Sequence, residues 1–451
     1  MESDLRSLRI TSIEKEEEDE EREDFGKEGE QEDDEDDEEE EDEVEVTLGF
    51  AEKPKNPCLL LRHLFPSKAG GVPVKKLSFF YSLFIFFILR IVLSSYISLQ
   101  ALFQFQHTQA WLDPVDLPAE KSFTCGFCRE PLQFLLQIYA PISDKEYTFH
   151  RMLYVFMCPS MSCLLKDQHE QWKRTVENPC RSVKIFRCQL PRSNPFYSSE
   201  PPKRNGTDIP TITGAPLCCW CGSWKGDKVC GSCKNARYCS AKHQSLHWRL
   251  GHKIECSKIL NLSETSASCI VNAKAKVRAT KKYASNSLWP EYEIIIEEEC
   301  TFDSEIPEDN RSITSLAFTS NRIDETYQLL SDKFEADTDK KVWASFQERI
   351  AKAPEQVLRY CQDPAAKPLW PLTIGRPSKE DIPRCNYCKG PLCYEFQIMP
   401  QLLFYFGVKN DPDSLDWGTI VAYTCLASCD ASISYKEEFA WVQLYPTATV
   451  A

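Results

Sequence analysis

Six cysteines and two histidines lie at metal-ligand spacing between Cys218 and Cys256. They form four pairs: Cys218-x2-Cys221, Cys230-x2-Cys233, Cys239-x3-His243 and His252-x3-Cys256. These eight soft or borderline donors are enough for two Zn²⁺ ions, because structural zinc takes four nitrogen or sulfur ligands tetrahedrally. So short a segment buries little apolar surface, and metal binding would therefore supply most of its folding free energy. Full ligation leaves no open position for a water nucleophile, so we expect structural zinc rather than hydrolysis.

The spacing of these pairs and the residues around them, such as Tyr238-Cys239-Ser240, resemble the MYND zinc finger. The resemblance implies that the pairs interleave. One zinc would then be held by Cys218, Cys221, Cys239 and His243, and the other by Cys230, Cys233, His252 and Cys256. Cys219 and His247 fall outside the pattern. The finger, residues 214–257, either binds a partner peptide or only braces the fold.

A second cysteine motif occurs twice. Residues 125–138 match residues 385–398 at six of fourteen positions, including both cysteines of a Cys-x2-Cys turn. Each copy is followed by a further cysteine pair, Cys158/Cys163 and Cys425/Cys429. Such self-similarity indicates one structural unit used twice.

Each unit could hold one more zinc. The candidate ligands are Cys125, Cys128, Cys158 and Cys163 in the first copy and Cys385, Cys388, Cys425 and Cys429 in the second. The alternative is that these cysteines are small buried hydrophobic side chains. The unequal spacing of the second pairs, x4 against x3, weakens the case for zinc without excluding it.

The expected fold is α+β and mostly β, with the duplicated cysteine-containing β module flanking the zinc-stabilised finger. Alternating and apolar runs predict strands over 132–139 and 152–158, and over 394–399 and 419–425. Apolar spacing predicts a helix over 340–353, and Pro354 predicts a second short helix over 354–360. The expected domains are an N-terminal β module (46–200), the finger (214–257), a linker with one edge strand near 288–297 (258–335), and a C-terminal β module (336–445).

The first 45 residues form an acidic tail. Residues 14–45 carry 24 acidic and 3 basic side chains, a net charge of −21, whereas the whole chain carries −15. A run of like charge cannot collapse, so we expect residues 1–45 to be disordered. The tail is either a solubilising arm or a polyanion that shields basic partners.

The apolar run over residues 77–99 is long enough to span a bilayer, although Arg90 inside it is costly there. A different origin is also consistent with the sequence. Val74 has codons that begin with GT, Gln109 can be encoded by CAG, and many intervening residue types have T-rich codons. These features are consistent with residues 74–109 being the translation of an intron that was retained in frame. No membrane partner is expected unless 77–99 is a genuine span.

The order of half-module, finger, linker and half-module resembles the programmed cell death protein 2 family. The resemblance covers nearly all of 46–445 except 74–109. The motifs that carry it include Phe65-Pro66-Ser67-Lys68, Gln189-Leu190-Pro191-Arg192, Pro290-Glu291-Tyr292-Glu293-Ile294, Pro354-Glu355-Gln356-Val357-Leu358-Arg359-Tyr360 and Glu437-Glu438-Phe439-Ala440-Trp441. In that family the stretches on either side of 74–109 run together as one motif.

The resemblance implies a non-enzymatic chaperone that escorts a nascent small-subunit ribosomal protein in 40S subunit biogenesis, in the cytoplasm and nucleus. The acidic tail could mask the client's charge, and the half-modules could offer open strand edges to an extended segment. Cysteines arranged as metal-ligand pairs, without a signal peptide, fit a reducing compartment.

The alternative function is a nuclear adaptor in transcription or cell-death regulation, whose finger binds proline-containing peptides. An enzyme is not expected, because the chain shows no glycine-rich cofactor loop and no nucleophile–base pairing. The basic stretch Lys274–Lys282 is short and reads as a linker or localisation signal, so direct nucleic-acid binding is not expected.

Overall fold

The computed structural model describes most of the chain after the acidic tail. The described residues are 44–55, 60, 62–71, 74–75, 108–109, 111–119, 122–170, 180–201, 214–265, 289–302, 337–409, 411, 413–430 and 432–445. Residues 1–43 of the predicted disordered tail lie outside them, and so do the apolar run 77–99 and the basic stretch 274–282.

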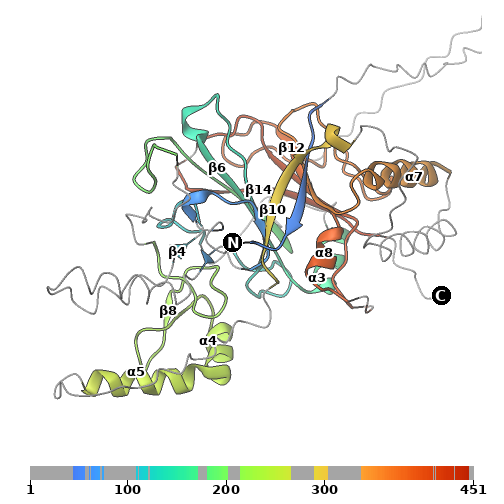
Figure 1. Cartoon of the computed structure of the whole chain (residues 1–451). Coiled ribbons are helices and arrows are strands. Elements are labelled where there is room, and N and C mark those ends of the chain that lie inside the picture. The colour runs from blue at the N-terminus through green and yellow to red at the C-terminus, as the bar shows by residue number, and fades with distance from the viewer. Residues whose placement is uncertain are drawn as a thin grey trace, which may run out of the picture. The chain divides into compact units, whose positions relative to one another are not determined.

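A closed antiparallel barrel of ten described strands forms the centre of the fold (Figure 1). The order around the barrel is β1, β10, β2, β5, β6, β7, β14, β13, β12 and β11, and β11 pairs with β1 to close it. The strands are β1 (Thr47–Glu52), β2 (Lys68–Ala69), β5 (Gln133–Tyr139), β6 (His150–Met157), β7 (Val183–Leu190), β10 (Tyr292–Glu298), β11 (Gln356–Tyr360), β12 (Leu392–Ile398), β13 (Thr419–Cys425) and β14 (Tyr435–Gln443). The mostly β fold expected from the sequence is confirmed.

The central strands are buried on both faces, which explains their nearly continuous apolar sequences. Every residue of β6 and of β13 is buried. On β6, Leu153 and Val155 belong to the cluster that fills the barrel, whereas Tyr154 and Phe156 belong to an aromatic cluster on the outside. A strand covered on both sides loses the polar alternation of a half-exposed strand.

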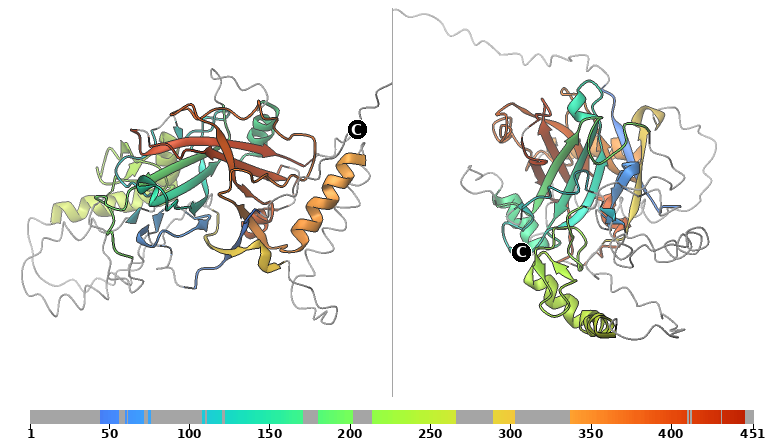
Figure 2. Two further views of the ribbon diagram at one scale, coloured as in Figure 1. Left: turned by 90° about the horizontal axis from the view of Figure 1, so that it is seen from above. Right: turned by 90° about the vertical axis from the view of Figure 1, so that its left-hand side faces the viewer.

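The two cysteine-containing halves share this barrel. We call β5, β6 and β7 with their connecting turns the N-terminal half, and β11 to β14 with theirs the C-terminal half. β7 pairs with β14, from Tyr435 opposite Cys188 to Glu438 opposite Ile185, and Figure 2 shows the strands of the two halves side by side. Because a separate half would expose β7 or β14 as an open edge, this pairing removes two edges at once.

Two expected elements differ from the structure. The strand expected at an edge near 288–297 is β10, and it lies between β1 and β2, where both of its sides are paired. The helix expected over 354–360 is wrong, because Gln356–Tyr360 is strand β11 and pairs with β1 and β12. The burial of Val357 and Leu358 and the ladder hydrogen bonds outweigh the helix-start preference of Pro354.

The helices occupy connections between the barrel strands and part of the finger. The expected helix over 340–353 is α7 (Asp337–Ala351), which packs Trp343, Phe346 and Ile350 against Met399. The other helices and helical turns are η2 (Arg62–Leu64), η5 (Glu146–Thr148), α3 (Met161–Glu170), α4 (Ala241–His247), η7 (Trp248–His252), α5 (Lys253–Thr265), η8 (Glu299–Phe302) and α8 (Gln401–Tyr405).

The ends of the hydrophobic insert meet. Strands β3 (Val74–Lys75) and β4 (Thr108–Gln109) form a two-stranded antiparallel sheet in which Val74 lies opposite Gln109. The two ends of the insert are therefore neighbours in space. No helix among the described residues is both long and apolar enough to cross a bilayer, and residues 77–99 are not among them.

Deletion of residues 74–109, joining Pro73 to Ala110, is expected to preserve cooperative unfolding. Because the loop ends already meet, shortening the closed loop should raise the free energy of unfolding by about 1–2 kcal/mol. Denaturant unfolding of the deleted and full-length chains measures this difference. Loss of the cooperative transition would show that the insert belongs to the folded barrel, and a spliced transcript lacking its codons would be direct evidence for the intron.

Candidate metal centres and their support

The first set of finger residues has the spacing of a tetrahedral zinc site. With Zn–S bonds of about 2.3 Å, two sulfur ligands of one zinc lie about 3.8 Å apart. The Sγ atoms of Cys221 and Cys239 are 3.8 Å apart, and Cys218 Sγ lies 3.7 Å from His243 Nδ1. Cys239 Sγ lies closer to the same ring nitrogen, at 3.1 Å.

The second set has the same geometry. Cys230 Sγ lies 3.9 Å from Cys256 Sγ, and Cys233 Sγ lies 3.6 Å from His252 Nε2. Within each set all four ligand atoms lie within 4.8 Å of one another. The structure therefore brings the eight residues together in the two interleaved sets that the resemblance implies, and their donors fit zinc.

The duplicated cysteines also come together, in one group per half. Cys125, Cys128, Cys158 and Cys163 form one four-sulfur group, and Cys385, Cys388, Cys425 and Cys429 form the other. The distance between Sγ atoms is 3.6 Å for Cys128 and Cys158 in the first group. In the second group it is 3.8 Å for Cys385 and Cys429 and 3.5 Å for Cys388 and Cys425. The unequal x4 and x3 spacings do not prevent the second pair of either half from reaching the first.

All four Cys-x2-Cys turns are built alike, and we call them knuckles. In each, the amide N–H of the residue after the second cysteine donates to the carbonyl of the first, over 2.8 to 3.1 Å. That residue has positive φ in every case: 62° at Arg129, 56° at Lys234, 62° at Lys389 and 66° at Gly222. Positive φ is costly for arginine and lysine, so the surrounding structure must hold these turns in place.

One thiol in every group is biased toward the thiolate, the form that binds metal. A hydrogen bond from Cys158 lowers the pKa of Cys125 to about 5, and hydrogen bonds from Cys221 and Cys239 lower the pKa of Cys218. The backbone N–H of Gly390 lowers the pKa of Cys388 to about 7.

In the second finger set, burial opposes ionisation of Cys230. The backbone N–H of Cys233 and the ring of His252 outweigh burial and lower the pKa of Cys230 to about 6.

Local structure positions the two finger histidines. Ser240 caps helix α4, and its hydroxyl accepts a hydrogen bond from the backbone N–H of His243 at 3.1 Å, which fixes the turn that carries this ligand. The Nδ1 atom of His252 lies 3.9 Å from Glu255, and its ring stacks on His247 with centroids 5.0 Å apart. Groups around a ligating histidine hold its ring orientation.

The finger is part of the protein core. Trp224, which follows the first knuckle, is fully buried and packs against Phe156 of β6, with centroids 4.1 Å apart and the rings tilted by 37°. Its indole N–H donates to the carbonyl of Leu132 over 2.8 Å. In return, Trp111 donates to the carbonyl of Ser223 over 2.7 Å. The finger and the outside of the N-terminal half therefore share one aromatic cluster.

Comparisons with known proteins agree with this arrangement. Family models match the N-terminal domain of programmed cell death protein 2 over residues 104–204, the MYND finger over 218–256, and the C-terminal domain of programmed cell death protein 2 over 340–444. Programmed cell death protein 2 of Bos taurus is 36% identical over 344 residues, covering 74% of this chain and 88% of that protein. The chain belongs to the programmed cell death protein 2 family.

The protein of the same name from Rattus norvegicus is 32% identical over 407 residues, covering 89% of this chain and 96% of that protein. A more distant relative, the probable 20S rRNA accumulation protein 4 of Schizosaccharomyces pombe, is 31% identical over 106 residues. That alignment covers 21% of this chain and 25% of the yeast protein. No solved structure matches this chain.

Several motifs that resemble the programmed cell death protein 2 family supply buried polar contacts of the barrel. Lys68 is fully buried and pairs with Glu291 at 2.7 Å. Arg359 pairs with Glu299 at 2.7 Å, and Gln189 donates to the carbonyl of Ser428 over 2.9 Å. These motifs therefore supply partners for several buried polar groups of the barrel.

Two buried arginine–glutamate pairs were not predicted from the sequence. Arg151 makes two hydrogen bonds to Glu395, of 2.5 and 2.8 Å, and Arg187 pairs with Glu438 at 2.5 Å. The detectable signal was a charged residue inside an otherwise apolar strand, as in β6, β7 and β12. Such a residue requires a buried partner.

Two tryptophans of the finger make a matched pair for testing its docking. Trp224→Ala is expected to lower the free energy of unfolding by about 3–5 kcal/mol, because it removes a fully buried indole. Trp248→Ala should lower it by no more than about 1–2 kcal/mol, because Trp248 is 38% exposed and lies outside the shared aromatic cluster. Denaturant titration compares them, and equal effects would contradict a finger docked through Trp224.

Adjacent cysteines test the ligand assignment. Cys218→Ser is expected to reduce the zinc bound per chain by one ion, because serine does not replace a thiolate in the first set. Cys219→Ser should leave the count unchanged, since Cys219 lies outside both sets. Native mass spectrometry counts the ions, and zinc loss from Cys219→Ser alone would reverse the assignment.

Proposed function

We propose that this chain is a non-enzymatic, zinc-binding escort for a basic small-subunit ribosomal protein, acting in 40S subunit biogenesis in the cytoplasm and nucleus. The observation that carries this proposal is family membership over most of the chain, together with the Schizosaccharomyces pombe relative named as a 20S rRNA accumulation protein. The name of that relative refers to the accumulation of 20S rRNA, and a small-subunit ribosomal protein must be delivered to ribosomal RNA.

Charge supplies a physical reason for such a client. A ribosomal protein that has not yet met RNA carries unneutralised positive charge. Residues 14–45 carry a net charge of −21 while the remainder of the chain sums to about +6, so the negative charge is concentrated in one segment. We infer that this segment attracts the client electrostatically, an effect that salt screens over about 8–10 Å.

The closed barrel changes the expected way of gripping the client. Open strand edges were expected for an extended client segment, but each of the ten barrel strands has a neighbour on both sides. Strand addition at an open edge is therefore not part of the proposal. The closed barrel instead supports the finger through the shared aromatic cluster.

Zinc has a structural part in this proposal. Two ions in the finger would hold the knuckle that positions Trp224 in the shared aromatic cluster. We also infer that the two halves are one duplicated unit, since both have a bulge at the same place in the motif, between Phe134 and Leu136 and between Tyr394 and Phe396.

A second candidate function rests on the surface of the finger. A shallow pocket there is lined by Cys230, Gln244, Ser245, Trp248, Arg249 and His252. Trp248 and Ile254 are exposed, at 38% and 61%. Aromatic side chains at a groove suit the preformed helix of a proline-containing peptide. This pocket favours the adaptor in transcription or cell-death regulation as the alternative.

Affinity purification of the tagged full chain from eukaryotic extract, followed by mass spectrometry, separates the two functions. Deletion of the whole finger is unsuitable, because Trp224 belongs to the core. The variants are therefore a deletion of residues 1–43 and Trp248→Ala, which alter the acidic tail and the finger pocket separately.

The escort function predicts one near-stoichiometric small-subunit ribosomal protein, retained by Trp248→Ala and weakened at least several-fold by the tail deletion. The weakening should be largest at low salt. Recovery of transcriptional regulators that disappear with Trp248→Ala, without any ribosomal protein, would instead support the adaptor.

A further inference from the structure

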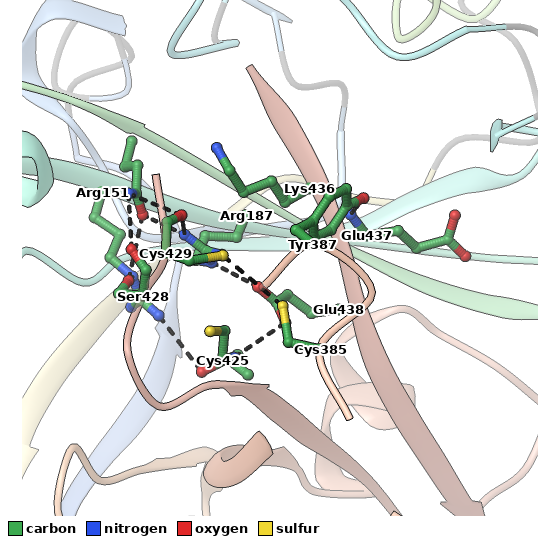
Figure 3. Close-up of polar contacts among 12 residues, drawn as sticks. Arg151, Arg187, Cys385, Tyr387, Cys425, Ser428, Cys429, Lys436, Glu437 and Glu438 are labelled. Carbon is green, nitrogen blue, oxygen red and sulfur yellow. Dashed lines mark hydrogen bonds and ion pairs between the residues drawn. The ribbon is translucent and has the colours of Figure 1, made fainter. Parts of the chain in front are cut away.

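The four-sulfur group of the C-terminal half lies against the polar end of the barrel interior. Cys425 ends β13, and Cys429 follows it across a turn in which Ser428 is fully buried with φ of 47°. Figure 3 shows this turn facing side chains from β6, β7 and β14. The turn that carries two candidate ligands is thus built into the barrel wall.

Arg187 of β7 reaches the sulfur group directly. Its Nη2 lies 3.7 Å from Cys429 Sγ, its Nη1 donates to the carbonyl of Cys429 over 3.1 Å, and its Nε donates to Glu438 over 2.5 Å (Figure 3). The other oxygen of Glu438 accepts from the backbone N–H of Cys425 over 3.1 Å. Arg187 and Glu438 therefore hold both cysteines of this turn.

Arg151 of β6 holds the middle of the same turn. Its Nε donates to Ser428 Oγ over 3.0 Å, while its two terminal nitrogens bind Glu395 of β12. Both arginines come from the N-terminal half, whereas the turn and the glutamates come from the C-terminal half. The two halves therefore interlock at these cysteines.

Charge explains why arginine suits this position. Four thiolates around one Zn²⁺ carry a net charge of −2, and buried negative charge needs nearby donors or cations. A guanidinium can donate to a sulfur ligand and to a carboxylate at once, because its five N–H groups point in fixed directions. Outer-sphere hydrogen bonds of this kind orient ligands and tune metal affinity.

We propose that Cys385, Cys388, Cys425 and Cys429 bind a zinc ion whose outer-sphere partner is Arg187 of the opposite half, so that metal binding and pairing of β7 with β14 are coupled. This site is separate from the finger and does not depend on which client the protein escorts. The sulfur separations of 3.5 and 3.8 Å match the edges of a zinc–thiolate tetrahedron and exceed the 2.05 Å of a disulfide.

Native mass spectrometry of the full-length chain, purified with zinc under reducing conditions, tests the metal site. Cys425→Ser is expected to hold one zinc fewer than wild type, whereas Cys393→Ser, a cysteine of the same half outside the group, should hold the same number. A zinc count unchanged by Cys425→Ser would overturn the proposal. A wild-type mass showing disulfides in place of the ion would overturn it as well.

Arg187→Lys tests whether zinc binding in the C-terminal half depends on Arg187 of the N-terminal half. The variant keeps the positive charge beside Glu438. Arg192→Lys, at an exposed arginine of the same half, is the matched control. We expect Arg187→Lys to lower the affinity of one zinc by 10- to 100-fold in competition with a chelator, the range typical of lost outer-sphere contacts. Zinc retention equal to that of Arg192→Lys would overturn the role of Arg187. Arg187→Lys keeps a cation opposite Glu438 and is therefore expected to fold. Its result tests the role of Arg187 even if Cys425→Ser does not fold.

Discussion

Two arginine–glutamate pairs buried inside the barrel constrain the rest of the structure. Arg151 is 1% exposed, and burial alone would lower its pKa, but the carboxylate of Glu395 outweighs burial and raises it. Arg151–Glu395 and Arg187–Glu438 each join the N-terminal half to the C-terminal half. Leaving one buried ion without its partner costs about 3–5 kcal/mol, so separating the two halves is energetically unfavourable.

This constraint explains why two similar halves form one barrel. Each half has its own four-sulfur group, bulged strand and knuckle. However, β7 of one half pairs with β14 of the other, and the buried arginines of one half pair with the glutamates of the other. The finger is then fixed to the N-terminal half through Trp224, and its exposed face, with Trp248, remains outside. The result is a closed barrel with the exposed face of the finger on the surface.

The sequence predicted the local chemistry better than the arrangement of strands. The four ligand pairs and most strands follow from spacing and apolar pattern, because knuckles and strand periodicity are local properties. The interleaving of the pairs was implied by the family resemblance and not by their spacing. The single barrel could not be predicted, since pairing between Glu438 and Ile185 depends on residues 253 positions apart. Gln356–Tyr360 was misassigned as a helix for the same reason: its conformation is decided by β1 and β12, not by Pro354.

The measurement that tests this account most directly is a double-mutant cycle on Arg151 and Glu395. We expect Arg151→Met and Glu395→Leu each to lower the free energy of unfolding by about 3–5 kcal/mol, because each leaves a buried charge unpaired. The double variant should recover most of that loss, giving a coupling energy of about 3 kcal/mol or more. Additive losses would contradict the account, since they would mean that the buried pairs do not hold the two halves together.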